Sequence, residues 1–203
     1  MPRLFAIIPA AGLSRRMGRH KLLLPLGRGT VIEQLLSVLR SSGIDEIIVV
    51  MRKHDHALRD VVERSGATVV QPDIDPPDMR TSVEHGLHAV AQRHSPTAAD
   101  GWLLSPADHP LLEPRVLGQL IDAWSRSTQP ILLPTFDGNR GHPTFFRWEL
   151  AEAVFTLPAE AGLNLLVRSH ADQLALIPVD SNAVLLDLDT PEDYERLLAN
   201  FAL

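Results

Sequence analysis

Short apolar runs that alternate with helix-forming patterns constrain the fold more than any other feature of the chain. Five of these runs have the length and composition of buried parallel strands, at residues 4–8, 47–51, 68–70, 102–104 and 131–133. Strand, helix and strand in this order imply right-handed crossovers, with function on the loops at the carboxyl ends of the strands. The sequence therefore predicts an α/β fold: a single domain over residues 1–203, Rossmann-like, with a doubly wound and mainly parallel sheet.

The segments between the strands predict three helices, at residues 31–42, 57–65 and 82–93. A glycine directly follows the end of each of the first two, as is typical of a helix C-terminus. Thr81 or Ser82 can cap the start of the third. Beyond residue 135 the elements become shorter, and glycine and proline interrupt them up to residue 178. This second region predicts a small insert that covers one side of the site.

Charge is distributed unevenly along the chain. The net charge is −6, yet residues 1–32 hold six Lys and Arg and no Asp or Glu. A local cationic region in an acidic protein indicates one small anionic ligand and no nucleic acid partner, because a nucleic acid needs a broad basic face. The lack of cysteine excludes disulfides, a thiolate nucleophile and a Cys-type zinc site, and fits a reducing cytosol. Since residues 4–8 are too short for a signal peptide core or a membrane span, we expect a cytoplasmic protein with no membrane partner.

The segment of residues 8–21, directly behind the first predicted strand, combines small residues, a hydroxyl and four cations. Backbone N–H groups of an Ala-Ala-Gly turn can point at phosphate oxygens, and arginine and lysine can neutralise the phosphate charge. The spacing fits neither a Walker loop nor a dinucleotide-binding glycine motif. We interpret the segment as a polyphosphate cradle, formed by Ala10, Ala11, Gly12, Ser14, Arg16 and Lys21.

Asp108 is the first carboxylate beyond the predicted strand at residues 102–104. A triphosphate held by Arg16 and Lys21 normally binds together with Mg²⁺. This ion prefers one or two carboxylates, phosphate oxygens and water over a closed protein cage. Asp108 is therefore a candidate magnesium ligand.

Two further carboxylates, Asp187 and Asp189, lie near the C-terminus. They precede a strong helix start, with an N-cap, a first-turn proline and a capping-box carboxylate at Thr190, Pro191 and Asp193. Their alternation places both on one face of an extended segment, and we favour Asp189 as the second metal ligand beside Asp108. Without metal, the carboxylates of Asp108 and Asp189 should repel each other.

With these motifs in place, the chain resembles a known family, the molybdenum cofactor cytidylyltransferases and MobA-like NTP transferases. Residues 10–21 match the pattern Ala-Ala-Gly-x-Ser-x-Arg-Met-Gly-x-x-Lys, which is highly specific for the superfamily. Further matching stretches span nearly the whole chain, at residues 22–26, 79–87, 108–110, 141–143 and 187–193. The resemblance implies a nucleotide-diphospho-sugar transferase-like fold.

The resemblance also implies a reaction, the transfer of a nucleoside monophosphate from a triphosphate to a phosphate-bearing acceptor with release of pyrophosphate. The catalytic residues would be Arg16 at the β and γ phosphates, Lys21 at the α-phosphoryl group, and Asp108. Asp108 and Asp189 would hold Mg²⁺. The nucleotide would bind over the first half of the sheet and the acceptor over the second. The remaining implied contacts are the backbone of residues 10–14 around the nucleotide, Ser82 near the base, and His142 at the acceptor.

Substrate identity is less constrained than the reaction. The Ala-Ala-Gly form is similar to that of cytidylyl-transferring members and favours CTP over GTP, with molybdopterin or its molybdenum-loaded form as acceptor. His109 and Asp78 depart from the family pattern, which usually has glutamine and glycine there, at positions expected to face acceptor or base. Two alternatives stay open: a nucleotidyltransferase of the same fold that uses a sugar phosphate, an alcohol phosphate or GTP, and a non-catalytic nucleotide-binding partner in molybdoenzyme maturation. A molybdoenzyme or a maturation chaperone is the expected protein partner.

Overall fold

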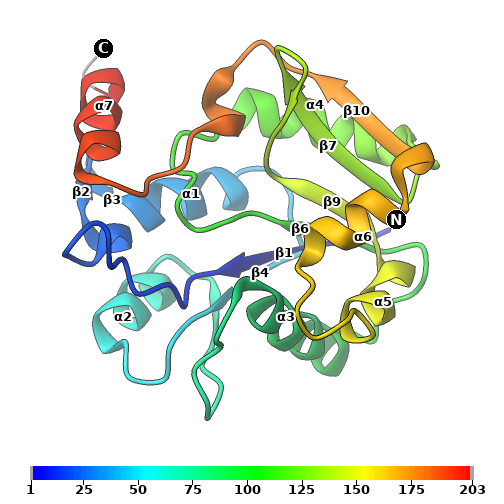
Figure 1. The fold of residues 1–203 in the computed structure, drawn as a ribbon, viewed down its shortest axis with the longest axis horizontal. Coiled ribbons are helices and arrows are strands. Elements are labelled where there is room, and N and C mark those ends of the chain that lie inside the picture. The colour runs from blue at the N-terminus through cyan, green and yellow to red at the C-terminus, as the bar shows by residue number, and fades with distance from the viewer. Residues whose placement is uncertain (1, 202–203) are drawn as a thin grey trace.

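An eight-stranded sheet carries the loops that form the site (Figure 1). The computed structural model describes residues 2–201. Across the sheet the strands follow the order β10-β7-β9-β6-β1-β4-β5, with β8 paired to β7, and β2 and β3 form a separate hairpin. Only β9 runs antiparallel to its neighbours β6 and β7 on this path, which confirms the mainly parallel sheet. The strands are β1 (Leu4–Pro9), β2 (Pro25–Leu26), β3 (Gly29–Thr30), β4 (Glu46–Val50), β5 (Thr68–Val70), β6 (Gly101–Leu104), β7 (Ile131–Phe136), β8 (Asn139–Arg140), β9 (Thr144–Arg147) and β10 (Leu174–Pro178).

Helices cover both faces of this sheet, as the side chains of β1 show. Leu4, Ala6 and Ile8 pack with α1, α2, α4 and α7, whereas Phe5 and Ile7 pack with α3, α5 and α6. Successive strand residues point to opposite faces, so a strand buried on both faces must be apolar throughout. In residues 2–201 no helix has both the length and the apolar composition to cross a membrane. The helices are α1 (Val31–Arg40), α2 (His56–Arg64), α3 (Met79–His94), α4 (Pro114–Arg126), α5 (Ala151–Phe155), α6 (Leu163–Ser169) and α7 (Pro191–Phe201).

The chain winds away from β1 in two directions. It first passes through α1, β4 and α2 to β5, and α3 then returns it to β6 on the other side of β1. This reversal makes the junction of β1 and β6 the topological switch point of the sheet. In open α/β sheets, ligands bind at this point, outside the carboxyl ends of the strands.

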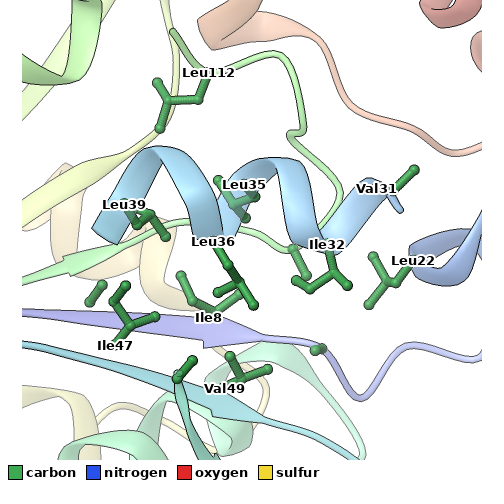
Figure 2. Close-up of a cluster of buried hydrophobic side chains, with 14 of the residues drawn as sticks. Ile8, Leu22, Val31, Ile32, Leu35, Leu36, Leu39, Ile47, Val49 and Leu112 are labelled. Carbon is green, nitrogen blue, oxygen red and sulfur yellow. The ribbon is translucent and has the colours of Figure 1, made fainter. Parts of the chain in front are cut away.

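Helix α1 fixes the end of the cradle loop against the core (Figure 2). The backbone N–H of Thr30 donates to Oε2 of Glu33 at 2.7 Å and so begins the helix with a capping-box bond. The buried side chains of Ile32 and Leu36 point toward Ile8 and the neighbouring strand. Leu22 packs into the same cluster, and each such side chain contributes about 1.5–3 kcal/mol by burial. Because Leu22 follows Lys21 directly, this packing also positions the Lys21 backbone.

Two expectations about boundaries are corrected. Residues 135–178 do not form an insert, because β9 and β10 lie within the main sheet and complete it. Helix α3 begins three residues earlier than predicted, at Met79, and its cap is Asp78, whose Oδ1 accepts a hydrogen bond from Thr81 N at 2.8 Å. Ser82 lies inside the first turn, where its hydroxyl donates to the carbonyl of Asp78. A serine that can bond four residues back is compatible with a helix interior, so it does not mark the boundary.

A buried ion pair joins the starts of β1 and β6. The Asp100 side chain is 5% exposed and accepts hydrogen bonds from the backbone N–H of Arg3 at 2.7 Å and of Thr97 at 2.8 Å. The Arg3 guanidinium lies 2.8 Å from Oδ2. Burial alone would raise the pKa of Asp100, but Arg3 and Thr97 hold it well below its usual range.

Replacing Asp100 by alanine is expected to lower the free energy of unfolding by roughly 2–4 kcal/mol, because two backbone amides and a guanidinium lose their acceptor. The folded state depresses this pKa, so the contribution is complete above about pH 4 and is lost as the pH falls further. Urea denaturation at pH 7 and below pH 4 checks both points. Asp122→Ala, at an exposed carboxylate on α4, is the control. An Asp100→Ala variant as stable at pH 7 as this control would contradict the expectation.

Candidate active site

The cradle loop and Asp108 meet at the switch point of the sheet. Residues 10–20 leave the carboxyl end of β1, and residues 105–110 leave that of β6. A cavity of about 190 Å³ lies where these loops converge. Residues from three distant parts of the sequence surround it, among them Ala10, Ala11, Gly12, Lys21, Ser82 and Asp108.

The cradle loop leaves its backbone amides available to a ligand. Ser14 and Gly18 have positive φ angles, 49° and 67°, and turn the chain sharply. The amides of Met17 and Gly18 bond to the carbonyl of Ser14 at 3.1 Å. Within the described chain, no amide of residues 11–16 donates to another protein group. Clustered free N–H groups in a turn form a concave site for anionic oxygens.

The ammonium group of Lys21 lies between two carboxylates. Its Nζ is 2.5 Å from Oδ2 of Asp108 and 3.0 Å from Oδ1 of Asp189. Partial burial opposes the charge of Lys21, but the attraction of both carboxylates prevails and raises its pKa. Burial would likewise raise the pKa of Asp189, yet hydrogen bonds and charge from Lys21 and Arg16 lower it. The expected repulsion between Asp108 and Asp189 is therefore offset by a charged amine between them.

Backbone hydrogen bonds carry Asp189 to this position. The amide of Leu188 donates to the carbonyl of Asp108 at 2.9 Å, so the two segments lie side by side. After Asp189 the predicted capping box forms: Thr190 N donates to Oδ2 of Asp193 at 2.7 Å, and Asp193 N donates to Oγ1 of Thr190 at 3.2 Å. Asp187 is exposed and does not share the Lys21 contact. The choice of Asp189 over Asp187 thus agrees with the geometry.

This donor set fits a hard divalent cation that also binds phosphate. In residues 2–201 no group of three or more His, Cys, Asp or Glu side chains is arranged to enclose a metal. The predicted metal site has two carboxylates, those of Asp108 and Asp189, and each lies within 3.0 Å of the Lys21 amine. Mg²⁺ usually takes one or two carboxylates and completes its octahedron with phosphate oxygens and water. Asp108 and Asp189 therefore match an ion that arrives with a nucleotide.

Arg16 and Ser14 lie outside the 190 Å³ cavity. The Arg16 side chain is 70% exposed, and its Nη2 is 2.6 Å from Oδ2 of Asp189. Ser14 lines a neighbouring hollow of about 330 Å³ together with Arg15 and Arg19. Its hydroxyl oxygen accepts a hydrogen bond from Lys21 N at 3.2 Å. Exposure leaves the Arg16 guanidinium accessible to an anionic ligand.

A larger cavity of about 580 Å³ lies over the second half of the sheet. Its walls are mainly apolar, with Leu104, Leu133 and Phe146 from strands and Leu163 and Val167 from α6. Asp78 and Met79 line both this cavity and the smaller one, so the two share a wall at the start of α3. A second ligand in the large cavity would approach the ligand of the small cavity at this wall.

His142 lines the large cavity and contacts His109. Their ring centroids are 5.1 Å apart, with the planes at 73°. Burial lowers the pKa of both imidazoles, that of His142 to about 4, so both are neutral at pH 7. Nδ1 of each is buried, and neither finds a hydrogen-bond partner in the described part of the chain. Since His109 follows Asp108, the histidine pair connects the large cavity to the carboxylates on Lys21.

The sequence analysis did not predict three features of the site. One is the position of Lys21 between the two carboxylates. Another is the wall that the two cavities share at Met79 and Asp78, of which only Asp78 was expected to face acceptor or base. The third is the set of three arginines that line the large cavity, Arg80, Arg140 and Arg168, which no local sequence pattern assigns to it.

Relatives of the chain align with it over nearly the whole of both sequences. It is 28% identical to the purine catabolism protein PucB of Bacillus subtilis, over 97% of this chain and 96% of that protein. It is 24% identical to the molybdenum cofactor cytidylyltransferase of Escherichia coli, over 96% and 95%. A probable molybdenum cofactor guanylyltransferase of Mycobacterium avium is 28% identical over 96% and 95%. Both cytidylyl and guanylyl transfer thus occur among the names of its relatives.

Solved structures agree with this relationship. Rv0371c of Mycobacterium tuberculosis superimposes with a TM-score of 0.82 at 28% identity, over 98% of this chain and 99% of that one. A structure of the same protein in complex with manganese gives a TM-score of 0.78 at 28% identity, over 98% of each chain. The sequence pattern of the MobA-like NTP transferase domain matches residues 6–174. The chain therefore belongs to the MobA-like NTP transferase family and is an enzyme of the nucleotidyltransferase class.

Proposed function

We propose that this enzyme transfers CMP from CTP to the phosphate of molybdopterin or of its molybdenum-loaded form, with release of pyrophosphate. The observation that carries the proposal is the Lys21 ammonium group, which lies between Asp108 and Asp189 at the mouth of a cradle of free amides. A cation and two carboxylates at the switch point suit a triphosphate with its metal. The second cavity, which shares a wall with the first, supplies room for an acceptor.

In this scheme an oxygen of the acceptor phosphate attacks the α-phosphorus of CTP. A new P–O bond forms, the bond from the α-phosphorus to the bridging oxygen breaks, and the electron pair leaves with pyrophosphate. The second pKa of a phosphate monoester is about 6, so the group is already deprotonated and nucleophilic at neutral pH and needs no general base. The residues act by positioning and charge: Lys21 faces the α-phosphoryl group and Arg16 the β and γ phosphates. Of residues 10–14, which grip the nucleotide through the backbone, Ala10 has its amide bonded to the carbonyl of Val50, so the free amides are those of residues 11–14.

Asp108 and Asp189 would hold Mg²⁺, which would neutralise charge on the phosphate oxygens. The two carboxylates, which contact Lys21 in the structure, would then also have the ion as a partner, and the Lys21 amine would be available to the phosphate. Lys21 thus keeps the two carboxylates together before the nucleotide arrives. In this scheme Lys21 is the charged partner of the α-phosphoryl group, and Arg16 is that of the β and γ phosphates.

The acceptor half of the proposal rests on the large cavity. His142, in contact with His109, presents a neutral ring to it, and apolar side chains from β6, β7, β9 and α6 form much of its wall. Ser82 borders the nucleotide cavity, which suits a place near the base. CTP is preferred in the proposal because the cradle has the Ala-Ala-Gly form. A molybdoenzyme or its maturation chaperone is the proposed recipient of the product.

Calorimetry with Mg²⁺ and a pyrophosphate-release assay with each triphosphate and candidate acceptor test this function. We expect Mg²⁺-dependent binding of CTP that is tighter than that of GTP, and pyrophosphate release that requires a molybdopterin-type acceptor. Equal or tighter binding of GTP would overturn the base preference. Pyrophosphate release with a sugar or alcohol phosphate but not with molybdopterin would overturn the acceptor.

A further inference from the structure

Arg80, the second residue of α3, connects this helix to the loop of residues 157–161. Its Nη1 donates to the carbonyls of Leu157 at 3.2 Å, Pro158 at 2.6 Å and Ala161 at 3.3 Å. The Arg80 side chain is only 16% exposed. Its Nε lies 2.9 Å from Oε1 of Glu84, one helical turn further along α3, in an ion pair that lacks the alignment of a hydrogen bond. One guanidinium is thus fixed by a carboxylate and directed at three carbonyls.

This loop has few other attachments. It lies between α5 and α6, and its remaining hydrogen bonds are local, such as Leu157 N to Val154 O and Ala161 N to Pro158 O. Among residues 2–201, Arg80 makes the only hydrogen bonds that connect residues 157–161 to a separate part of the fold. Loss of these bonds would leave the loop held by the packing of Leu157 against the core and by the ends of two short helices.

The same loop is a wall of the 580 Å³ cavity. Ala159, Glu160 and Ala161 line that cavity, and Gly162 and Leu163 continue the wall into α6. The first turn of α3 borders both cavities through Asp78 and Met79, and Arg80 itself lines the large one. Arg80 therefore fixes the outer wall of the large cavity relative to the nucleotide cavity.

We propose that Arg80 is a positioning residue for the acceptor: it holds residues 157–161 so that the large cavity keeps the shape that binds the second substrate. Arg80 acts through the loop carbonyls, and Glu84 acts through Arg80 by fixing its orientation. The proposal rests on the proposed function in one respect, the assignment of the large cavity to the acceptor. Lysine cannot fully replace arginine here, since its single nitrogen cannot lie both at the position of Nη1 beside the three carbonyls and at that of Nε beside Glu84.

Two kinds of measurement test this role in the full chain, with Arg80→Lys and Glu84→Gln as variants. We expect the KM for the acceptor to rise roughly 10-fold with Arg80→Lys, as for the loss of hydrogen bonds to a charged group, while kcat and the KM for CTP change less than about 3-fold. Glu84→Gln should raise the acceptor KM in the same direction by a smaller factor. Amide hydrogen exchange should become faster in residues 157–162 in both variants, while exchange in β1 and β6 stays unchanged.

Arg59 and Glu63 on α2 supply the matched control. They form the same kind of pair four residues apart, also at 2.9 Å, but both are about half exposed and hold no loop. Arg59→Lys and Glu63→Gln should leave the acceptor KM and the exchange of residues 157–162 unchanged. Wild-type exchange of this loop in Arg80→Lys would overturn the proposal even if the enzyme used a different acceptor. An Arg80→Lys variant with faster loop exchange and an unchanged acceptor KM would overturn the link to substrate binding.

Discussion

Replacing Lys21 by alanine is expected to lower kcat about 10²- to 10³-fold, the usual effect of removing one electrostatic stabiliser of a transition state. In the proposed function the Lys21 amine, which lies 2.5 Å from Asp108 in the structure, meets the charge that develops at the α-phosphoryl group. Arg16→Ala should lose a similar factor in kcat/KM for the nucleotide. Steady-state pyrophosphate release, measured over a range of CTP concentrations, separates the two effects.

The Lys21→Ala variant should remain folded, because the apolar clusters on both faces of the sheet do not depend on this amine. Lys53, the only other lysine of the chain, forms an exposed pair with Asp73 at 2.9 Å, so Lys53→Ala is the control for loss of a lysine. Undiminished turnover in Lys21→Ala would show that the amine only neutralises Asp108 and Asp189. An unfolded variant would show that it is a structural residue.

Asp108→Asn and Asp189→Asn are each expected to lower the metal-dependent turnover rate by a factor on the order of 10³ or more. Asparagine keeps the size of the side chain but loses the charge that attracts a divalent cation. The metal-free variants should differ from the wild type by less than about 1 kcal/mol in unfolding free energy, since each loses one partly exposed contact with Lys21 and one like-charge repulsion. Calorimetric titration of Mg²⁺ into the protein with a non-hydrolysable CTP analogue measures the metal affinity, and urea denaturation measures the stability.

Asp187→Asn is the matched control, because Asp187 lies two residues before Asp189 but is exposed and does not contact Lys21. It should bind Mg²⁺ and turn over like the wild type. If Asp189→Asn instead retained full metal affinity while Asp187→Asn lost it, the assignment of the second ligand would be wrong. Wild-type activity in Asp108→Asn would remove the metal site from this position altogether.

Local sequence signals were sufficient for much of the fold and for predicting that several candidate site residues lie together at one edge of the sheet. The apolar run Leu4–Pro9 is buried on both faces and so had to be a central strand. The cradle behind it and the carboxylate behind β6 follow from that strand assignment, because parallel strands end at the same edge of a sheet. The capping signal at Thr190 likewise located the start of α7, and so the loop that carries Asp189.

What the sequence did not predict depends on contacts between distant segments. β9 enters the sheet antiparallel between β6 and β7, a pairing that periodicity within residues 144–147 cannot reveal. Asp78 caps α3 although Thr81 and Ser82 follow it, since the choice among neighbouring cap residues depends on where the preceding loop is held. The amine between Asp108 and Asp189 and the bonds from Arg80 to residues 157–161 need tertiary structure, because no local pattern fixes such distances.

The central claim is nucleotidyl transfer at this site, and tracing a radioactive label at the α-phosphorus of CTP tests it most directly. The purified protein is incubated with Mg²⁺, the molybdopterin acceptor and CTP that carries ³²P at the α position, and products are separated by chromatography. Label should appear in the acceptor in amounts equal to the pyrophosphate released, and this transfer should disappear in Lys21→Ala and Asp108→Asn. Label that leaves as free CMP irrespective of the acceptor, or transfer that persists in both variants, would contradict nucleotidyl transfer at this site.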